Sequence, residues 1–184
     1  MANRSPNTLK PYSMITDFVT GREIPNIGAE ENRQAVAQYL VKEKGYSKDD
    51  IEVDVKIEMA IAGEHYQSQV DLVVTNEGRL RIMAIKCAAG SLGSREREIV
   101  AAARLLEDYQ IPFGVVSDGK TAIVLDTVSG KKLGEGMAAI PSKEAAIHML
   151  DSYRPISLTA DRLEREKLIF RTYDSENVNV QRKL

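Results

Sequence analysis

Apolar residues recur along the chain with a helical period in some stretches and with a two-residue alternation in others. From about Glu30 to Lys44 the apolar positions repeat every three to four residues, which predicts a helix that ends at Gly45. On this helix Glu30 and Arg33 fall on the inward face, whereas Glu31 points away from it. The apolar stripe consists of Val36, Ala37, Leu40 and Val41.

Strict alternation from Ile51 to Met59 predicts a strand with one buried and one solvent-facing side. Two further strands are predicted at Gln69–Thr75 and Leu80–Cys87, with a hairpin turn at Asn76-Glu77-Gly78 between them. The third strand is apolar on both sides, which indicates a central position in the sheet. The apolar side of the first strand is formed by Ile51, Val53, Val55, Ile57 and Met59.

The second half of the chain predicts a crossover followed by more helices. A helix capped by Ser94 extends to about Gln110, and strands follow at Phe113–Val116 and Thr121–Asp126. Later helices are expected at about 143–153 and 160–173. The strand–helix–strand unit over 80–116 implies a right-handed crossover and a parallel strand pair. We therefore expect an α/β fold with a central mixed β-sheet flanked by helices. Residues 1–28, rich in Pro and Gly, are expected to form an irregular arm, and residues 29–184 a single domain.

Composition narrows the class of protein. The 184 residues are 43% hydrophobic and 28% charged, as in a globular domain. No apolar run approaches the ~18–20 residues of a membrane span, and the N-terminus lacks the apolar core of a secretory signal. Because Cys87 is the only cysteine, no internal disulfide can form, and a cytoplasmic location is expected. The net charge of -2 argues against strong non-specific binding of nucleic acid.

Acidic and basic residues on neighbouring strands are expected to meet at one edge of the sheet. With the turn centred near Glu77-Gly78, Asp71 is predicted to lie across from residue 83 or 84. Lys86 shares a strand face with Ala84, two residues away. Asp71 and Lys86 should therefore converge, and Glu30 could reach the same spot from the first helix.

The ordered set of motifs resembles the PD-(D/E)xK nuclease superfamily, and more narrowly the N-terminal domain of type I restriction enzyme R subunits. The resemblance covers roughly residues 20–135 and implies a restriction-endonuclease-like fold from a bacterial restriction system. It is carried by Thr20-Gly21-Arg22-Glu23-Ile24-Pro25, Glu30-Glu31-Asn32-Arg33-Gln34, Tyr39-Leu40-Val41, Gly45-Tyr46, Asp71-Leu72-Val73-Val74, Lys86, Ile111-Pro112-Phe113-Gly114 and Asp118-Gly119.

The resemblance implies roles for these residues. In the family, an aspartate at the position of Asp71 and an acidic residue two positions before the lysine bind Mg²⁺. The lysine, here Lys86, orients the attacking water, and a helix glutamate at the position of Glu30 assists. Hard oxygen ligands suit Mg²⁺, which stabilises charge on the phosphate and lowers the pKa of bound water.

This chain departs from the family pattern at its centre, where the (D/E)xK triplet reads Ala84-Ile85-Lys86. A methyl group cannot bind Mg²⁺, so two interpretations stay open. In one, the missing acid has migrated to the following helix as Glu96 or Glu98. In the other, the fold is retained with a dead active site and no cofactor. The stretch Arg95-Glu96-Arg97-Glu98 also reads as a solvated turn of mixed charge.

Contact with DNA would need a local basic patch, because the net charge is acidic. The best candidates for such a patch are Arg95, Arg97 and Arg104, near Lys86. Arg97 and Arg104 share a helical face. Two functions follow as hypotheses: a Mg²⁺-dependent DNA endonuclease domain, or a catalytically silent module that binds DNA or protein. Candidate partners are DNA, subunits of a restriction system or other proteins, and a second copy of the chain. No membrane partner is expected.

Overall fold

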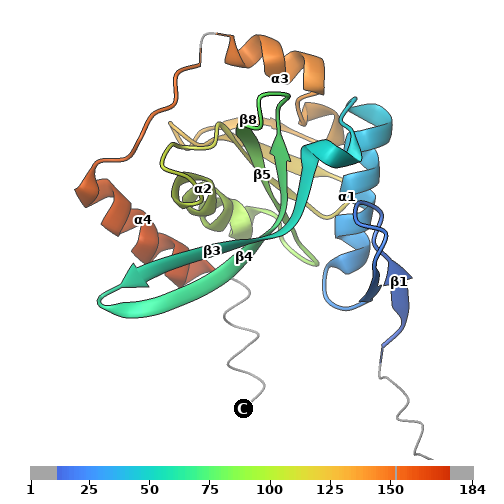
Figure 1. Cartoon of the computed structure of the whole chain (residues 1–184), viewed down its shortest axis with the longest axis horizontal. Helices are drawn as coiled ribbons and strands as arrows, with labels where there is room; N and C mark the ends of the chain where they lie inside the picture. The colour runs from blue at the N-terminus through green and yellow to red at the C-terminus, as the bar shows by residue number, and fades with distance from the viewer. Residues whose placement is uncertain (1–11, 152, 175–184) are drawn as a thin grey trace, which may run out of the picture.

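The computed structural model describes residues 12–151 and 153–174, which form a mixed sheet between two layers of helices (Figure 1). The six strands are ordered β3-β4-β5-β6-β7-β8, and every neighbouring pair is antiparallel except β5 and β6, which are parallel. Helix α2 connects these two parallel strands. The architecture confirms the α/β, restriction-endonuclease-like fold with a mixed sheet.

The strands of the main sheet are β3 (Ile51–Ile61), β4 (Glu64–Thr75), β5 (Arg81–Cys87), β6 (Phe113–Ser117), β7 (Ala122–Asp126) and β8 (Lys132–Glu135). The helices are α1 (Glu30–Glu43), α2 (Glu96–Leu105), α3 (Lys143–Leu150) and α4 (Ala160–Tyr173). A separate two-stranded hairpin is formed by β1 (Met14–Thr16) and β2 (Glu23–Pro25). Among the described residues, no helix combines the length and the apolar character that crossing a membrane requires.

Two hydrophobic cores lie on the two faces of the sheet. Helix α1 buries Val36 and Leu40 against one face, where β4 and β5 contribute Leu72 and Ile85. Helices α2 and α4 cover the other face, and Phe170 of α4 is among its largest buried side chains. Each strand of the sheet centre is therefore buried on both sides, which explains why β5 reads as a continuous apolar run.

The β3–β4 hairpin changes faces partway along its length. Val53 packs in the α1 core, whereas Val55 packs in the α2 core. Between them Asp54 has a φ of 52°, in the left-handed region, and the ladder resumes with Val55 opposite Val70. The prediction that all the apolar residues from Ile51 to Met59 lie on one side is therefore wrong. An alternation of apolar and polar residues does not reveal one residue with a left-handed backbone conformation, such as Asp54.

Other departures from the expected elements have local causes. Helix α2 ends at Leu105 rather than near Gln110, because the following turn is held by other contacts, among them a Glu107–Arg81 ion pair of 2.8 Å. The exposed edge strand β8 carries too weak a pattern to be predicted. The arm, expected to be irregular, contains the β1–β2 hairpin within its described part, while residues 1–11 lie outside the described residues. So do residues 152 and 175–184.

Candidate functional site

Asp71 and Lys86 meet at the end of β5, as expected, with Lys86 Nζ donating to Asp71 Oδ1 at 3.3 Å. The strand register differs from the prediction, because Leu72 pairs with Ile85 and Asp71 therefore continues the ladder opposite Lys86. A wide turn from Asn76 to Leu80 and a bulge beside Val74 and Thr75 shift β5 by two to three residues. The shift brings the carboxylate and the ammonium face to face.

The second oxygen of Asp71 has a structural role. Asp71 Oδ2 accepts the backbone N–H of Cys87 at 2.5 Å. On its other side β5 continues its parallel pairing with β6 as far as Cys87 and Ser117. The carboxylate thus satisfies an amide at the end of the strand, where an unpaired buried donor would be costly.

Glu98 enters the same cluster from the first turn of α2. Its Oε1 lies 3.7 Å from Lys86 Nζ, and its Oε2 lies 3.5 Å from Arg95 Nη1. Only 3% of Glu98 is exposed, so the expectation of a solvated turn is wrong for this residue. Glu96 instead faces Lys132 at 4.0 Å and remains partly exposed. Of the two acids considered as replacements, the fold brings only Glu98 to the lysine.

The described members of this cluster are Asp71, Lys86, Arg95 and Glu98. Two carboxylates face two cations, and the Lys86 ammonium contacts both acids. Within residues 12–151 and 153–174, no group of three or more histidine, cysteine or acidic side chains is placed to hold a metal ion. A Mg²⁺ site needs several oxygen ligands around one point. In the cluster as described, the Lys86 ammonium contacts both of the carboxylates that such a site would use, so Mg²⁺ binding would require this ammonium to move.

Position 84, where the resemblance to nucleases implies a second acid, lies inside an apolar core. Ala84 is fully buried between Val73 of β4 and Gly114 of β6. Its side chain belongs to the core under α2, which includes Ile99 and Val100. The side chain at this position therefore contributes to apolar packing.

Glu30 belongs to a second network, on the α1 side of the sheet. Arg33 binds it with two nitrogens, Nη2 at 2.6 Å and Nε at 3.2 Å, and Gln34 Nε2 donates to it at 2.7 Å. Among the described residues, the Glu30 carboxylate bonds to Arg33 and Gln34 of its own helix and not to Asp71 or Lys86. The structure therefore brings Asp71 and Lys86 together and places Glu30 in a neighbouring network.

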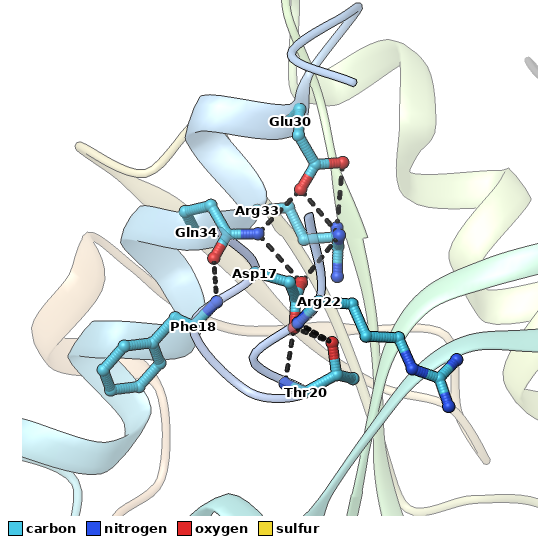
Figure 2. A network of polar contacts seen from close by, with 7 residues as sticks. All are labelled: Asp17, Phe18, Thr20, Arg22, Glu30, Arg33 and Gln34. Atoms are coloured by element: carbon cyan, nitrogen blue, oxygen red, sulfur yellow. Dashed lines mark hydrogen bonds and ion pairs between the residues drawn. The ribbon is translucent and has the colours of Figure 1, made fainter. Parts of the chain in front are cut away.

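Asp17, a residue that the sequence did not single out, is the centre of this second network (Figure 2). Its carboxylate accepts from the Thr20 amide at 2.6 Å, contacts Arg33 Nη2 at 2.9 Å and accepts from Gln34 at 3.0 Å. Gln34 also accepts the amide of Phe18 at 2.7 Å. The spacing of Asp17 and Thr20, typical of a side-chain-capped turn, is the one signal that could have indicated it.

Cys87 lies between the two networks. Burial raises the pKa of its thiol well above the usual value, and the negative charge of Asp71 acts in the same direction, while Lys86 and Arg33 oppose it. Charges from both sides of the sheet thus act on one buried group at the end of β5. This thiol stays protonated and serves as a small apolar residue.

Asp17→Asn is expected to lower the free energy of unfolding by about 2 kcal/mol at pH 7, because it removes a charge paired with buried Arg33. Burial tends to raise the pKa of Asp17, but the Thr20 amide, Gln34, the Thr20 hydroxyl and Arg33 together lower it below 3.8. A group with a lowered folded-state pKa stabilises the fold above its unfolded pKa and loses that effect as the pH falls through the folded value. Denaturant unfolding from pH 7 to pH 2.5 should show the two proteins converging below about pH 4. A constant difference across this range would contradict the charge-based account.

The three arginines proposed for DNA binding have different surroundings. Arg104 is buried, and its guanidinium contacts Glu166 of α4 at 2.7 Å and donates to the carbonyl of Thr127 at 2.7 Å. The expectation that Arg104 lies on a free basic face is wrong, because α4 covers that side of α2. Arg97 is exposed and donates to the hydroxyl of Tyr173, also on α4. Arg95, beside Glu98, is the remaining one of the three.

Comparison of the sequence with known proteins identifies the family of the chain. A sequence profile of the family described as "Type I restriction enzyme R protein N terminus" matches residues 28–141, more than half of the chain. No curated protein and no solved structure gives a match. The matched residues contain the cluster around Lys86 and every strand of the six-stranded sheet, and they contain Glu30, Arg33 and Gln34 of the second network but not Asp17. The chain therefore belongs to the family of type I restriction enzyme R protein N-terminal domains.

Proposed function

We propose that this chain is a catalytically silent restriction-endonuclease-like domain that serves a restriction system as a protein-binding module. The observation that carries the proposal is the buried cluster of Asp71, Lys86, Glu98 and Arg95. Its lysine contacts both acids, and Arg95 contacts Glu98, so each described charge of the cluster has an opposite charge beside it. Such a cluster stabilises the end of β5 without requiring any ligand.

Two further observations support the silent interpretation. One oxygen of Asp71 accepts a hydrogen bond from the Cys87 amide. Ala84 is enclosed by apolar side chains at the position where a metal-binding acid would stand. The family fold says little about chemistry when the site is altered. Hydrolysis of DNA would require these contacts to be exchanged for metal and phosphate contacts.

Protein is favoured over DNA as the partner because the expected basic patch is weakened. Arg104 is paired with Glu166 inside the molecule, and Arg95 faces Glu98. Affinity for DNA depends on the number of phosphates that free cations neutralise. The net charge of -2 adds a general repulsion.

A Mg²⁺-dependent DNA endonuclease is the second candidate, and one observation favours it. Glu98 lies 3.7 Å from Lys86, where a migrated acid would be required. In that case the ammonium would withdraw from between the two carboxylates when the metal binds. The same experiment distinguishes the two candidates.

The test uses the purified chain with supercoiled plasmid in the presence of Mg²⁺ or Mn²⁺. We expect no metal-dependent nicking above that of the Asp71→Asn and Glu98→Gln variants. Binding of a labelled DNA duplex at about 150 mM salt should also be undetectable, since few phosphates would be neutralised. Cleavage by the wild type that both substitutions abolish would establish the endonuclease instead. Salt-sensitive DNA binding that is lost in an Arg95→Gln/Arg97→Gln variant would make DNA the partner.

A further inference from the structure

A groove of about 430 Å³ lies between β3, the end of α2 and α4, away from both polar networks. Its walls include four half-buried apolar side chains, those of Met59, Leu105, Leu158 and Leu163. This volume lies within the ~300–1,000 Å³ typical of ligand-binding pockets. In Figure 1, α4 lies beside the projecting β3–β4 hairpin, where this groove is found.

The groove follows the outer edge of the sheet. Both Glu58 and Met59 line it, and neighbouring residues of a strand point to opposite faces. A cavity that touches both must therefore lie against the edge of β3. In the part of the chain that the structure describes, β3 is the first strand of the sheet and pairs only with β4. Its outer edge thus offers backbone groups to an added strand.

The rim of the groove carries uncompensated negative charge. Lys167 is paired with Glu164 at 2.6 Å, and Arg104 shares Glu166 with Arg162, each at 2.7 Å, so both cations of the lining have acidic partners. Among the residues described, no ion pair involves Asp108, and Glu58 has only His65 at 4.0 Å, which is charged only when protonated. The groove therefore favours a cationic occupant.

We propose that this groove binds an extended peptide segment of a partner protein, one in which leucine or valine alternates with lysine or arginine. The segment would add to the outer edge of β3 through main-chain hydrogen bonds. Its apolar side chains would contact Met59 and Leu163, and its cations would lie near Glu58 and Asp108. This inference rests on the proposed function as a protein-binding module and names the chemistry of the partner.

The experiment measures fluorescence anisotropy of a labelled peptide, GLRVKLG, added to the full chain. We expect saturable binding that weakens as salt is raised, and no binding of the acidic counterpart GLEVELG. The Glu58→Lys/Asp108→Lys variant should lose roughly tenfold in affinity, because both rim charges are reversed. A matched control, Glu43→Lys/Glu144→Lys, reverses two exposed carboxylates outside the groove and should stay within about twofold of the wild type.

A second probe tests pairing with the strand edge. The same peptide with alternate backbone nitrogens methylated keeps its charges but cannot complete a β-ladder, and it should bind at least about tenfold more weakly. Equal binding of both peptides, or equal effects of the rim and control variants, would overturn the proposal. The proposal would also be overturned if the wild-type chain formed dimers and the Glu58→Lys/Asp108→Lys variant did not, because a second copy of the chain would then occupy the groove. The plasmid assay tests catalysis and the peptide assay tests binding in the groove. A failure of the proposed function can therefore be told apart from a failure of the proposed peptide binding.

Discussion

Replacement of Lys86 by methionine is expected to lower the free energy of unfolding by about 4 kcal/mol. The substitution keeps most of the side-chain volume but removes the ammonium that contacts both Asp71 and Glu98. Both acidic residues are buried, so their carboxylates would be left close together in an environment of low polarity. Urea denaturation at pH 7 measures the change.

A double variant shows whether the loss comes from the acids. Lys86→Met/Glu98→Gln neutralises one of the two carboxylates and should recover about half of the lost stability, since one buried charge then remains. Asp71 is less suitable for this control, because it also accepts the Cys87 amide. A Lys86→Met protein more stable than the wild type would instead indicate a strained catalytic site and contradict the silent interpretation.

Ala84→Glu, which restores the acid of the family motif, is expected to destabilise the domain by about 4 kcal/mol or more. Ala84 is fully buried among apolar side chains of the α2 core, so a carboxylate there loses hydration and also crowds the packing. Ala89→Glu, at an exposed alanine three residues beyond Lys86, is the matched control and should be nearly neutral. Thermal unfolding compares the two variants.

Metal binding by the same variant separates the two functional candidates. On the silent interpretation, Ala84→Glu should gain no affinity for Mg²⁺, because Lys86 still lies between Asp71 and Glu98. Calorimetry with Mg²⁺ on the folded fraction tests this. A stable Ala84→Glu protein that binds Mg²⁺ more tightly than the wild type would mean that the site lacks only one ligand.

The sequence predicts much of the fold because its elements carry strong local patterns. The stripe of α1 and the apolar run of β5 are set by burial, and burial leaves a clear period in the sequence. The pairing of Asp71 with Lys86 could also be predicted, although through an incorrect register. The turn after β4 and the bulge beside it depend on the backbone of a few residues, for which the sequence gives no comparable pattern.

Polar residues in the interior were harder to predict than the core. Glu98 and Arg104 lie in helical positions that read as solvated, and only the packing of β5 and α4 against α2 makes them buried. Asp17 comes from a segment with a weak pattern, and its helical partners Arg33 and Gln34 lie more than a dozen residues away in the sequence. Long-range burial of charge leaves no periodic signal, so these residues became apparent only from tertiary structure.

The bond from the Cys87 amide to Asp71 affects how enzyme signatures are read in related chains. Because this aspartate completes the backbone pairing of a buried strand, selection for folding alone can preserve it after hydrolysis has been lost. The same reasoning applies to its lysine partner, because the ammonium neutralises the buried carboxylate at the strand end. An aspartate and a lysine at these two positions are therefore insufficient grounds for assigning nuclease activity within this family. The side chain two residues before the lysine, the packing around it and any acid brought to the lysine by the following helix have to be examined together with them.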